Sequence, residues 1–193
     1  MALPGEKLKC VSIVCGLGPP DIGMRGANWV HWLGFTVGWR YAPSFIMRWF
    51  WQRQPAGRQD LTDEERLELM LQQNGTTAET ISQKKDLEVL GDRDFLQMCL
   101  RSSRESFAQG FDGVLQDGTL MCMDWDFRIE DIRPDLPVQL WYGALDTHIP
   151  LNHGEQIAAR LGGRAYLRVE DETHASIGIS RRVDVLKALV RST

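Results

Sequence analysis

Hydrophobic residues follow three different patterns along the 193-residue chain. The first is a short apolar run from about Cys10 to Cys15, rich in β-branched residues and followed by Gly16 and the Pro19–Pro20 pair. An apolar run of this length, closed by residues that break regular structure, predicts one buried strand followed by a sharp loop.

The second pattern, from about Asp21 to Asp117, is helical. Its clearest segment is DLTDEERLELMLQQNG, in which Thr62 and Glu65 have the spacing of an N-terminal capping box. The Asn74–Gly75 pair predicts the end of this helix. A further helix is predicted over DRDFLQMCLRSSRESFAQG, and its expected apolar stripe consists of Phe95, Met98, Cys99 and Phe107.

In the third pattern, short apolar runs alternate with amphipathic segments. LPVQLWYG and RAYLRVED are expected to be strands, whereas LNHGEQIAARLGG and VDVLKALVRS are expected to be helices. Strands that alternate with helices at this spacing predict a parallel sheet with crossover helices, so the predicted fold class is α/β.

The composition is that of a globular protein, with 43% hydrophobic and 25% charged residues. A net charge of -4 argues against a nucleic-acid partner, because nucleic-acid-binding proteins normally carry a basic patch. The four cysteines form no C-x-x-C pair, and the chain shows no secretory leader. Both observations favour buried, reduced thiols in a cytoplasmic protein.

An unusual aromatic stretch, NWVHWLGFTVGWRYAPSFIMRWFWQRQ, holds five of the seven tryptophans. Its apolar part is only about half as long as a membrane-spanning helix, so no span is expected. Packing of a helical sub-domain onto the sheet is the favoured interpretation, and lining of a substrate pocket is the second. Contact with a membrane surface is not expected. For a pocket, the expected ligand is a hydrophobic small molecule, and the candidate binding residues are Trp29, Trp32 and Trp39.

Two residues that could perform acid–base chemistry follow the last two predicted strands. Gly143 is expected to end the first strand, which places Asp146 of LWYGALDTHIP in the loop beyond it. His174 of VEDETHASI is expected in the loop after the next strand. Such a histidine could take a proton from a nucleophile, while the acid fixes its tautomer and stabilises the imidazolium.

At these residues the chain resembles the α/β-hydrolase superfamily. LPVQLWYGALDTHIPLNHGEQIAARL and RAYLRVEDETHASI are similar to the family's acid-strand and histidine-strand segments, and LKCVSIVCGLGPPDIG resembles the strand that leads into a helical cap. The resemblance implies a partial α/β-hydrolase-like parallel sheet, its last three strands, with a large helical cap insertion. It divides the chain into a first strand and loop (1–20), a cap (21–118) and the C-terminal part of the core (119–193). Asp146 would be the triad acid and His174 the triad base.

The chain departs from this family at the nucleophile. None of its serines lies in a G-x-S-x-G motif, and the donors of the oxyanion hole would also lie upstream of Met1. We therefore expect a truncated chain without its nucleophile, whose first strand has a free edge that a second copy or a partner could cover. A longer enzyme, a truncated relic and a stable protein completed by a partner all fit this expectation.

The expected function is that of a protein related to enzymes that hydrolyse esters, lactones, amides or epoxides of hydrophobic small molecules. The alternative is a non-catalytic, hydrolase-like binding or accessory protein. His148 and His153 are spaced for neither a single helix face nor a known zinc pattern, so no metal is expected. No cofactor is expected either. His148 is expected near the mouth of the site, and His153 on a helix surface.

Overall fold

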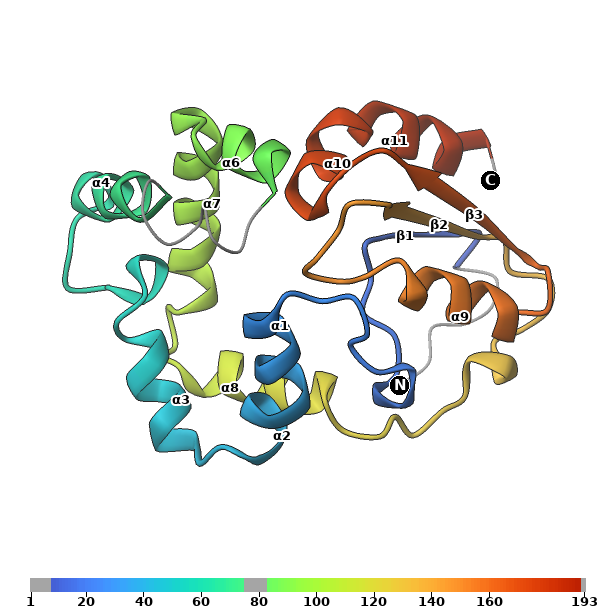
Figure 1. Cartoon of the computed structure of the whole chain (residues 1–193), viewed down its shortest axis with the longest axis horizontal. Helices are drawn as coiled ribbons and strands as arrows, with labels where there is room; N and C mark the ends of the chain where they lie inside the picture. Colours follow the sequence, from blue (N-terminus) through green and yellow to red (C-terminus); the bar gives the residue numbers. More distant parts are fainter. Residues whose placement is uncertain (1–7, 75–82, 192–193) are drawn as a thin grey trace. The chain divides into compact units, whose positions relative to one another are not determined.

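The computed structural model describes residues 8–74 and 83–191, and it divides the chain into two compact units (Figure 1). One unit contains residues 1–27 and 125–193, and the other contains residues 28–124. The chain passes from one unit to the other after Ala27 and again after Asp124, whereas the sequence placed these changes after residues 20 and 118.

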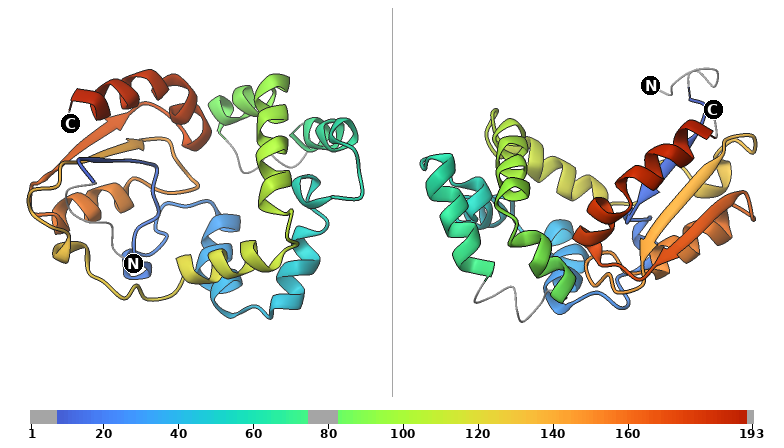
Figure 2. Two further views of the ribbon diagram at one scale, coloured as in Figure 1. Left: turned by 180° about the vertical axis from the view of Figure 1, so that it is seen from behind. Right: turned by 90° about the horizontal axis from the view of Figure 1, so that it is seen from above.

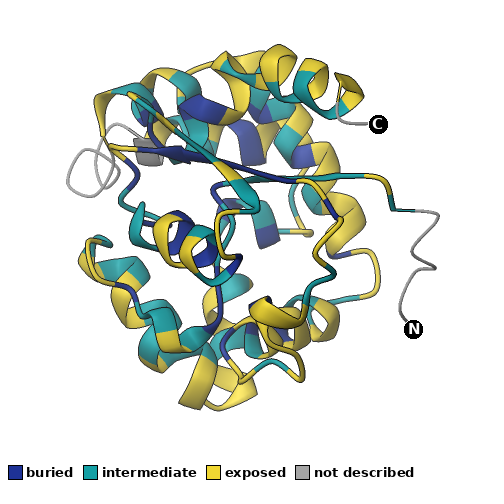
Figure 3. Cartoon of the chain, turned by 90° about the vertical axis from the view of Figure 1, so that its right-hand side faces the viewer, coloured by how far each residue is buried: buried dark blue, intermediate teal, exposed yellow. Residues whose placement is uncertain are grey.

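The first unit is built on a three-stranded parallel sheet, as the α/β class predicts. Its strands are β1 (Val11–Val14), β2 (Val138–Gly143) and β3 (Ala165–Glu170), in the order β1-β2-β3. All six residues of the central strand β2 are buried (Figure 3). β1 was expected to be a buried strand with a free edge, and its residues are only half-buried because it is an edge strand among the described strands.

Helices cover both faces of this sheet. Helix α9 (Asn152–Arg160) connects β2 to β3 and packs on one face, while α10 (His174–Ser180) and α11 (Arg182–Arg191) lie on the other (Figures 1 and 2). Short 3-10 turns occur at η1 (Pro20–Ile22) and η4 (Ile129–Asp131).

Neighbouring residues of β2 pack on opposite faces, as alternation along a strand requires. Trp141 is fully buried and packs with Cys15 and Ile177 of α10. Tyr142 faces α9, where a Cβ on Gly154 would lie only 2.5 Å from its ring. The Tyr142 hydroxyl donates a hydrogen bond to the carbonyl of Gly16 at 2.6 Å, which ties the loop after β1 to the centre of the sheet.

The second unit is helical. In chain order it contains α1 (Trp29–Leu33), the π-helical turn η2 (Gly34–Gly38), α2 (Trp39–Tyr41), α3 (Ser44–Trp51), the 3-10 turn η3 (Pro55–Gly57), α4 (Asp63–Asn74), α6 (Lys84–Leu90), α7 (Arg93–Ser106) and α8 (Asp112–Met121). Among the described helices, none combines the length and the apolar character needed to cross a bilayer.

The start of α4 confirms the predicted capping box. The Thr62 N–H donates to Glu65 Oε2 at 2.8 Å, and the Glu65 N–H donates to Thr62 Oγ1 at 3.3 Å. Helix α4 ends at Asn74, and Gly75, the second residue of the predicted stop, lies outside the described residues.

The apolar stripe predicted for α7 is partly wrong. Met98 is 55% exposed, whereas Leu96 and Leu100 are buried against Leu67 of α4. Leu96 and Leu100 are one helical turn apart and therefore share a face, which Met98 does not. Phe107, the last member of the predicted stripe, is buried as expected.

Candidate active site

The structure brings Asp146 and His174 together at the carboxyl ends of β2 and β3. Strand β2 ends at Gly143, as predicted, and a tight turn follows in which the Asp146 N–H bonds to the Gly143 carbonyl. Asp146 Oδ2 and His174 Nδ1 are 2.9 Å apart, which is a hydrogen-bond distance. The sequence expected this pair to meet because parallel neighbouring strands end at the same edge of a sheet.

The carboxylate of Asp146 is fully buried and has several donors. Its Oδ1 accepts the backbone N–H groups of His148 at 2.8 Å and Ile149 at 2.9 Å. Burial acts to raise the pKa of Asp146, but the hydrogen bond and charge of His174, the Ile149 N–H and the Cys15 thiol together lower the pKa below 3.8. Asp146 is therefore ionised at neutral pH and can only accept hydrogen bonds.

The sequence predicted that His174 lies in a loop. In the structure it is instead the first residue of helix α10. Thr173 is the N-cap that precedes the helix, and its N–H and hydroxyl both donate to Ser176 Oγ, at 2.9 and 2.8 Å. Thr173 is of a residue type favoured at the N-cap, and this signal could have revealed the seven-residue helix. This cap matters for the site because it holds the backbone next to His174 at the start of α10.

The pairing with Asp146 selects one tautomer of His174. Because the ionised carboxylate has no hydrogen to donate, Nδ1 carries the hydrogen and Nε2 holds the lone pair of the neutral ring. The His174 side chain is 40% exposed, so small molecules can approach the ring. An imidazole that is oriented by a buried carboxylate and open to solvent can accept a proton from an attacking hydroxyl group.

Gly143 allows the two residues to approach. A Cβ at this position would lie 2.2 Å from the carbonyl oxygen of Glu172, in the segment that leads into α10. The same backbone accepts a hydrogen bond from the Leu145 N–H at 3.0 Å. Only glycine therefore lets the end of β2 and the segment before His174 pack this closely.

Cys15 lies next to Asp146 and His174, and the sequence did not reveal this third residue of the site. It directly follows β1, is buried, and adopts a φ of 46°, in the left-handed region that few residues other than glycine occupy. Its sulfur and one ligand atom each of Asp146 and His174 all lie within 4.8 Å of one another. A backbone conformation of this kind costs about 1–3 kcal/mol and is concentrated at functional sites.

Thiolate, carboxylate and imidazole are ligand types that Zn²⁺ uses, so Cys15, Asp146 and His174 could hold a metal ion. Tetrahedral zinc would require the oxygen and nitrogen ligands to be about 3.3 Å apart, given bonds of about 2.0–2.1 Å. The observed 2.9 Å between Asp146 and His174 is a hydrogen bond that a metal would have to open. The geometry therefore suits proton transfer better than metal binding.

The remaining histidines of this unit lie close by. The His148 ring packs edge-on against the His174 ring, with centroids 5.2 Å apart. The expectation that His153 lies on a helix surface is wrong, because it is 1% exposed and its Nδ1 accepts the Gly18 N–H at 3.1 Å. Burial lowers the pKa of His153, opposed in part by the charge of Asp146. Its position in α9 holds the loop after β1.

The three candidate tryptophans belong to the helical unit. Trp29 and Trp39 line an apolar cavity of about 810 Å³ within that unit. Trp32 is 49% exposed and is not one of the lining residues. The structure therefore places two of the three candidate tryptophans at this cavity.

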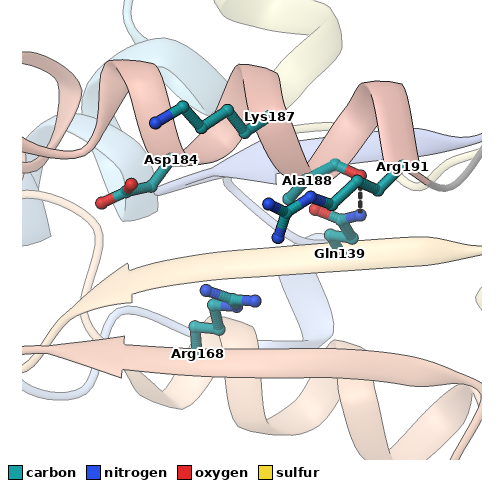
Figure 4. A pocket seen from close by; sticks show the side chains of 6 residues that line it. All are labelled: Gln139, Arg168, Asp184, Lys187, Ala188 and Arg191. Atoms are coloured by element: carbon teal, nitrogen blue, oxygen red, sulfur yellow. Dashed lines mark hydrogen bonds between the residues drawn. The ribbon is translucent and has the colours of Figure 1, made fainter.

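A polar hollow of about 380 Å³ lies in the first unit, beneath α11 (Figure 4). Its lining includes Arg168, Lys187 and Arg191, with Asp184 as the acidic member. Arg168 stacks on the Trp141 ring, with its guanidinium carbon 4.4 Å from the ring centroid. Neither Asp146 nor His174 lines this hollow, so it is separate from the acid–base pair.

Comparisons with known proteins do not assign the chain to a family. No family model matches it, and no curated protein or solved structure matches it either.

Proposed function

We propose that the protein is a hydrolase of the α/β-hydrolase type, in which Asp146 and His174 are the acid and the general base. The proposed substrates are esters, lactones, amides or epoxides of hydrophobic small molecules. The observation that carries this proposal is the 2.9 Å contact between Asp146 Oδ2 and His174 Nδ1 at the ends of neighbouring parallel strands. The strand order β1-β2-β3 and the helical segment between β1 and β2 in the chain, in the position of a cap, support it further.

In the proposed reaction, His174 Nε2 takes the proton from an attacking O–H group as its oxygen bonds to the electrophilic carbon of the substrate. Asp146 stays ionised throughout and stabilises the imidazolium that forms. His174 then returns the proton to the leaving oxygen or nitrogen as its bond to carbon breaks. General-base catalysis of this kind contributes about 10²–10⁴-fold to a rate.

No residue of this sequence is assigned as the covalent nucleophile, because none of its serines lies in a G-x-S-x-G motif. An activated ester does not need one, since water assisted by a general base can attack it directly. Hydrolysis of p-nitrophenyl butyrate by the purified chain therefore tests the acid–base pair alone.

We expect the chain to accelerate this hydrolysis above buffer, and His174→Gln to remove the acceleration. Asp146→Asn should reduce it, whereas Arg182→Gln on the exposed surface of α11 should leave it unchanged. Equal rates for the wild type and His174→Gln would contradict the proposal. They would favour the second candidate, a non-catalytic binding or accessory protein.

A further inference from the structure

The helical unit contains an apolar cavity of about 810 Å³, formed mainly by residues of α1, η2 and α3. This volume is within the range of about 300–1,000 Å³ that small-molecule sites occupy. The lining is composed of aromatic and aliphatic side chains, with His31 and Gln54 as its polar members apart from the tryptophans. Among the described residues that line it there is no Asp, Glu, Lys or Arg.

One wall of the cavity is held by close aromatic packing. Trp39 lies against α8 at Gly118, where a Cβ would come within 2.2 Å of the indole ring. The Trp39 and Trp51 rings have centroids 5.9 Å apart, and Trp51 in turn contacts the buried Phe107 at 6.2 Å. The indole of Trp39 is therefore fixed by its neighbours, and this wall is formed before any ligand arrives.

Two glycines, Gly34 and Gly38, line the cavity, and neither packing nor backbone conformation requires them. Gly34 and Gly38 have right-handed helical φ values of -57° and -58°. A Cβ at Gly34 would meet no heavy atom within 4 Å, and at Gly38 only the Leu33 carbonyl oxygen, at an ordinary 3.7 Å. Glycine inside a helix is less stable than alanine by about 1 kcal/mol, so these two positions leave space in the cavity at a cost in stability.

The two glycines begin and end the π-helical turn η2. The Trp39 N–H bonds to the Gly34 carbonyl five residues earlier, which gives this turn its wide geometry. Single π-turns within helices frequently occur at functional sites. A wide turn with glycine at both ends, beside a cavity with a fixed aromatic wall, is an arrangement suited to holding a ligand.

We propose that the helical unit binds an uncharged, largely apolar small molecule in this cavity, against the glycines of η2. A charged group would lose hydration without gaining an opposite charge from the described lining residues, so ionised ligands are disfavoured. Met47, Met70 and Met121 line the cavity with flexible side chains that can adapt to the shape of the ligand. The proposal does not depend on the acid–base pair, because every described residue of the lining belongs to the unit of residues 28–124.

The test uses the full chain and the neutral fluorescent probe N-phenyl-1-naphthylamine. Gly34→Phe should fill the cavity and weaken probe binding by about 10-fold or more, because a phenyl ring removes contact area for the ligand. Gly113→Phe is the matched control, since Gly113 is a helical glycine of α8 with open space around it and does not line the cavity. It should bind the probe as the wild type does.

Gly38→Leu fills the cavity from the other end of η2 and decides the question if Gly34→Phe fails to fold by circular dichroism. In competition at about pH 8, 1-dodecanol should displace the probe at least about 10-fold better than dodecanoate, whose carboxylate is ionised. His174→Gln should bind the probe normally, which separates this proposal from the hydrolase proposal. Equal probe binding by the folded cavity variants and Gly113→Phe, or equal displacement by the acid and the alcohol, would overturn the cavity assignment.

Discussion

The substitution Gly143→Ala adds one methyl group at the closest backbone contact of the candidate site. Its Cβ would lie 2.2 Å from the Glu172 carbonyl oxygen and 2.8 Å from the carbonyl carbon. The first of these distances is about 1.2 Å short of the 3.4 Å at which ordinary contact begins. Because the clash is with backbone and not with the end of a flexible side chain, the segment that leads into α10 must move.

This movement should affect both stability and chemistry. Overpacking of this kind costs typically about 1–3 kcal/mol, so we expect the free energy of unfolding to fall by that amount. A shift of about 1 Å, carried through Thr173, would lengthen the 2.9 Å contact between Asp146 and His174 beyond hydrogen-bond range. Misplacement of a catalytic group by about 1 Å can reduce a rate about 10²-fold.

Urea unfolding followed by tryptophan fluorescence measures the first effect, and hydrolysis of p-nitrophenyl butyrate measures the second. The matched control is Gly178→Ala in α10, where a Cβ meets nothing within 4 Å. This control should retain the rate of hydrolysis. Its free energy of unfolding should rise by up to about 1 kcal/mol, because alanine is the better helix former. A Gly143→Ala variant with wild-type stability and rate would refute the inferred close approach.

Two further predictions concern buried charge and pH. Arg66→Ala should destabilise the helical unit by about 2–3 kcal/mol in urea unfolding, because the buried Arg66 guanidinium donates to the Pro55 carbonyl at 3.1 Å. Arg93→Ala removes exposed ion pairs and should lower the free energy of unfolding by less than about 1 kcal/mol. Equal losses of stability in the two variants would contradict the argument that burial makes Arg66 the more important of the two. Burial lowers the pKa of His153 below 6.5, so the unfolded chain takes up the proton first and stability should decline as pH falls below 6.5. In unfolding curves measured at several pH values below 6.5, His153→Gln should weaken the dependence of stability on pH. An unchanged dependence would show that other groups cause it.

Features with local sequence patterns were predicted well. The run of apolar residues in β2, its end at Gly143 and the capping box of Thr62 and Glu65 are all found in the structure. The meeting of Asp146 and His174 was also predictable, because the carboxyl ends of neighbouring parallel strands lie at one edge of the sheet.

Features that depend on contacts between distant segments could not be predicted in the same way. His153 is buried and accepts a hydrogen bond from Gly18, a contact between residues far apart in the sequence that the local pattern of α9 does not reveal. Cys15 joins the site through a left-handed backbone conformation that an apolar strand pattern does not reveal. Helix α10 is short and contains Gly178, so its helical pattern was weak, and the cap formed by Thr173 was its clearest signal.

The central claim is that Asp146 holds His174 with the hydrogen on Nδ1, leaving the Nε2 lone pair to act as a base. Long-range ¹H–¹⁵N NMR spectra identify the tautomer of a neutral imidazole ring, and about pH 8 is a suitable condition because it lies above the ordinary pKa of histidine. We predict that His174 shows the Nδ1–H form in the wild type. We also predict that this preference weakens in Asp146→Asn, where the carboxylate that accepts this hydrogen is lost. An Nε2–H form in the wild type, or the same tautomer ratio in both proteins, would contradict the proposed acid–base pair.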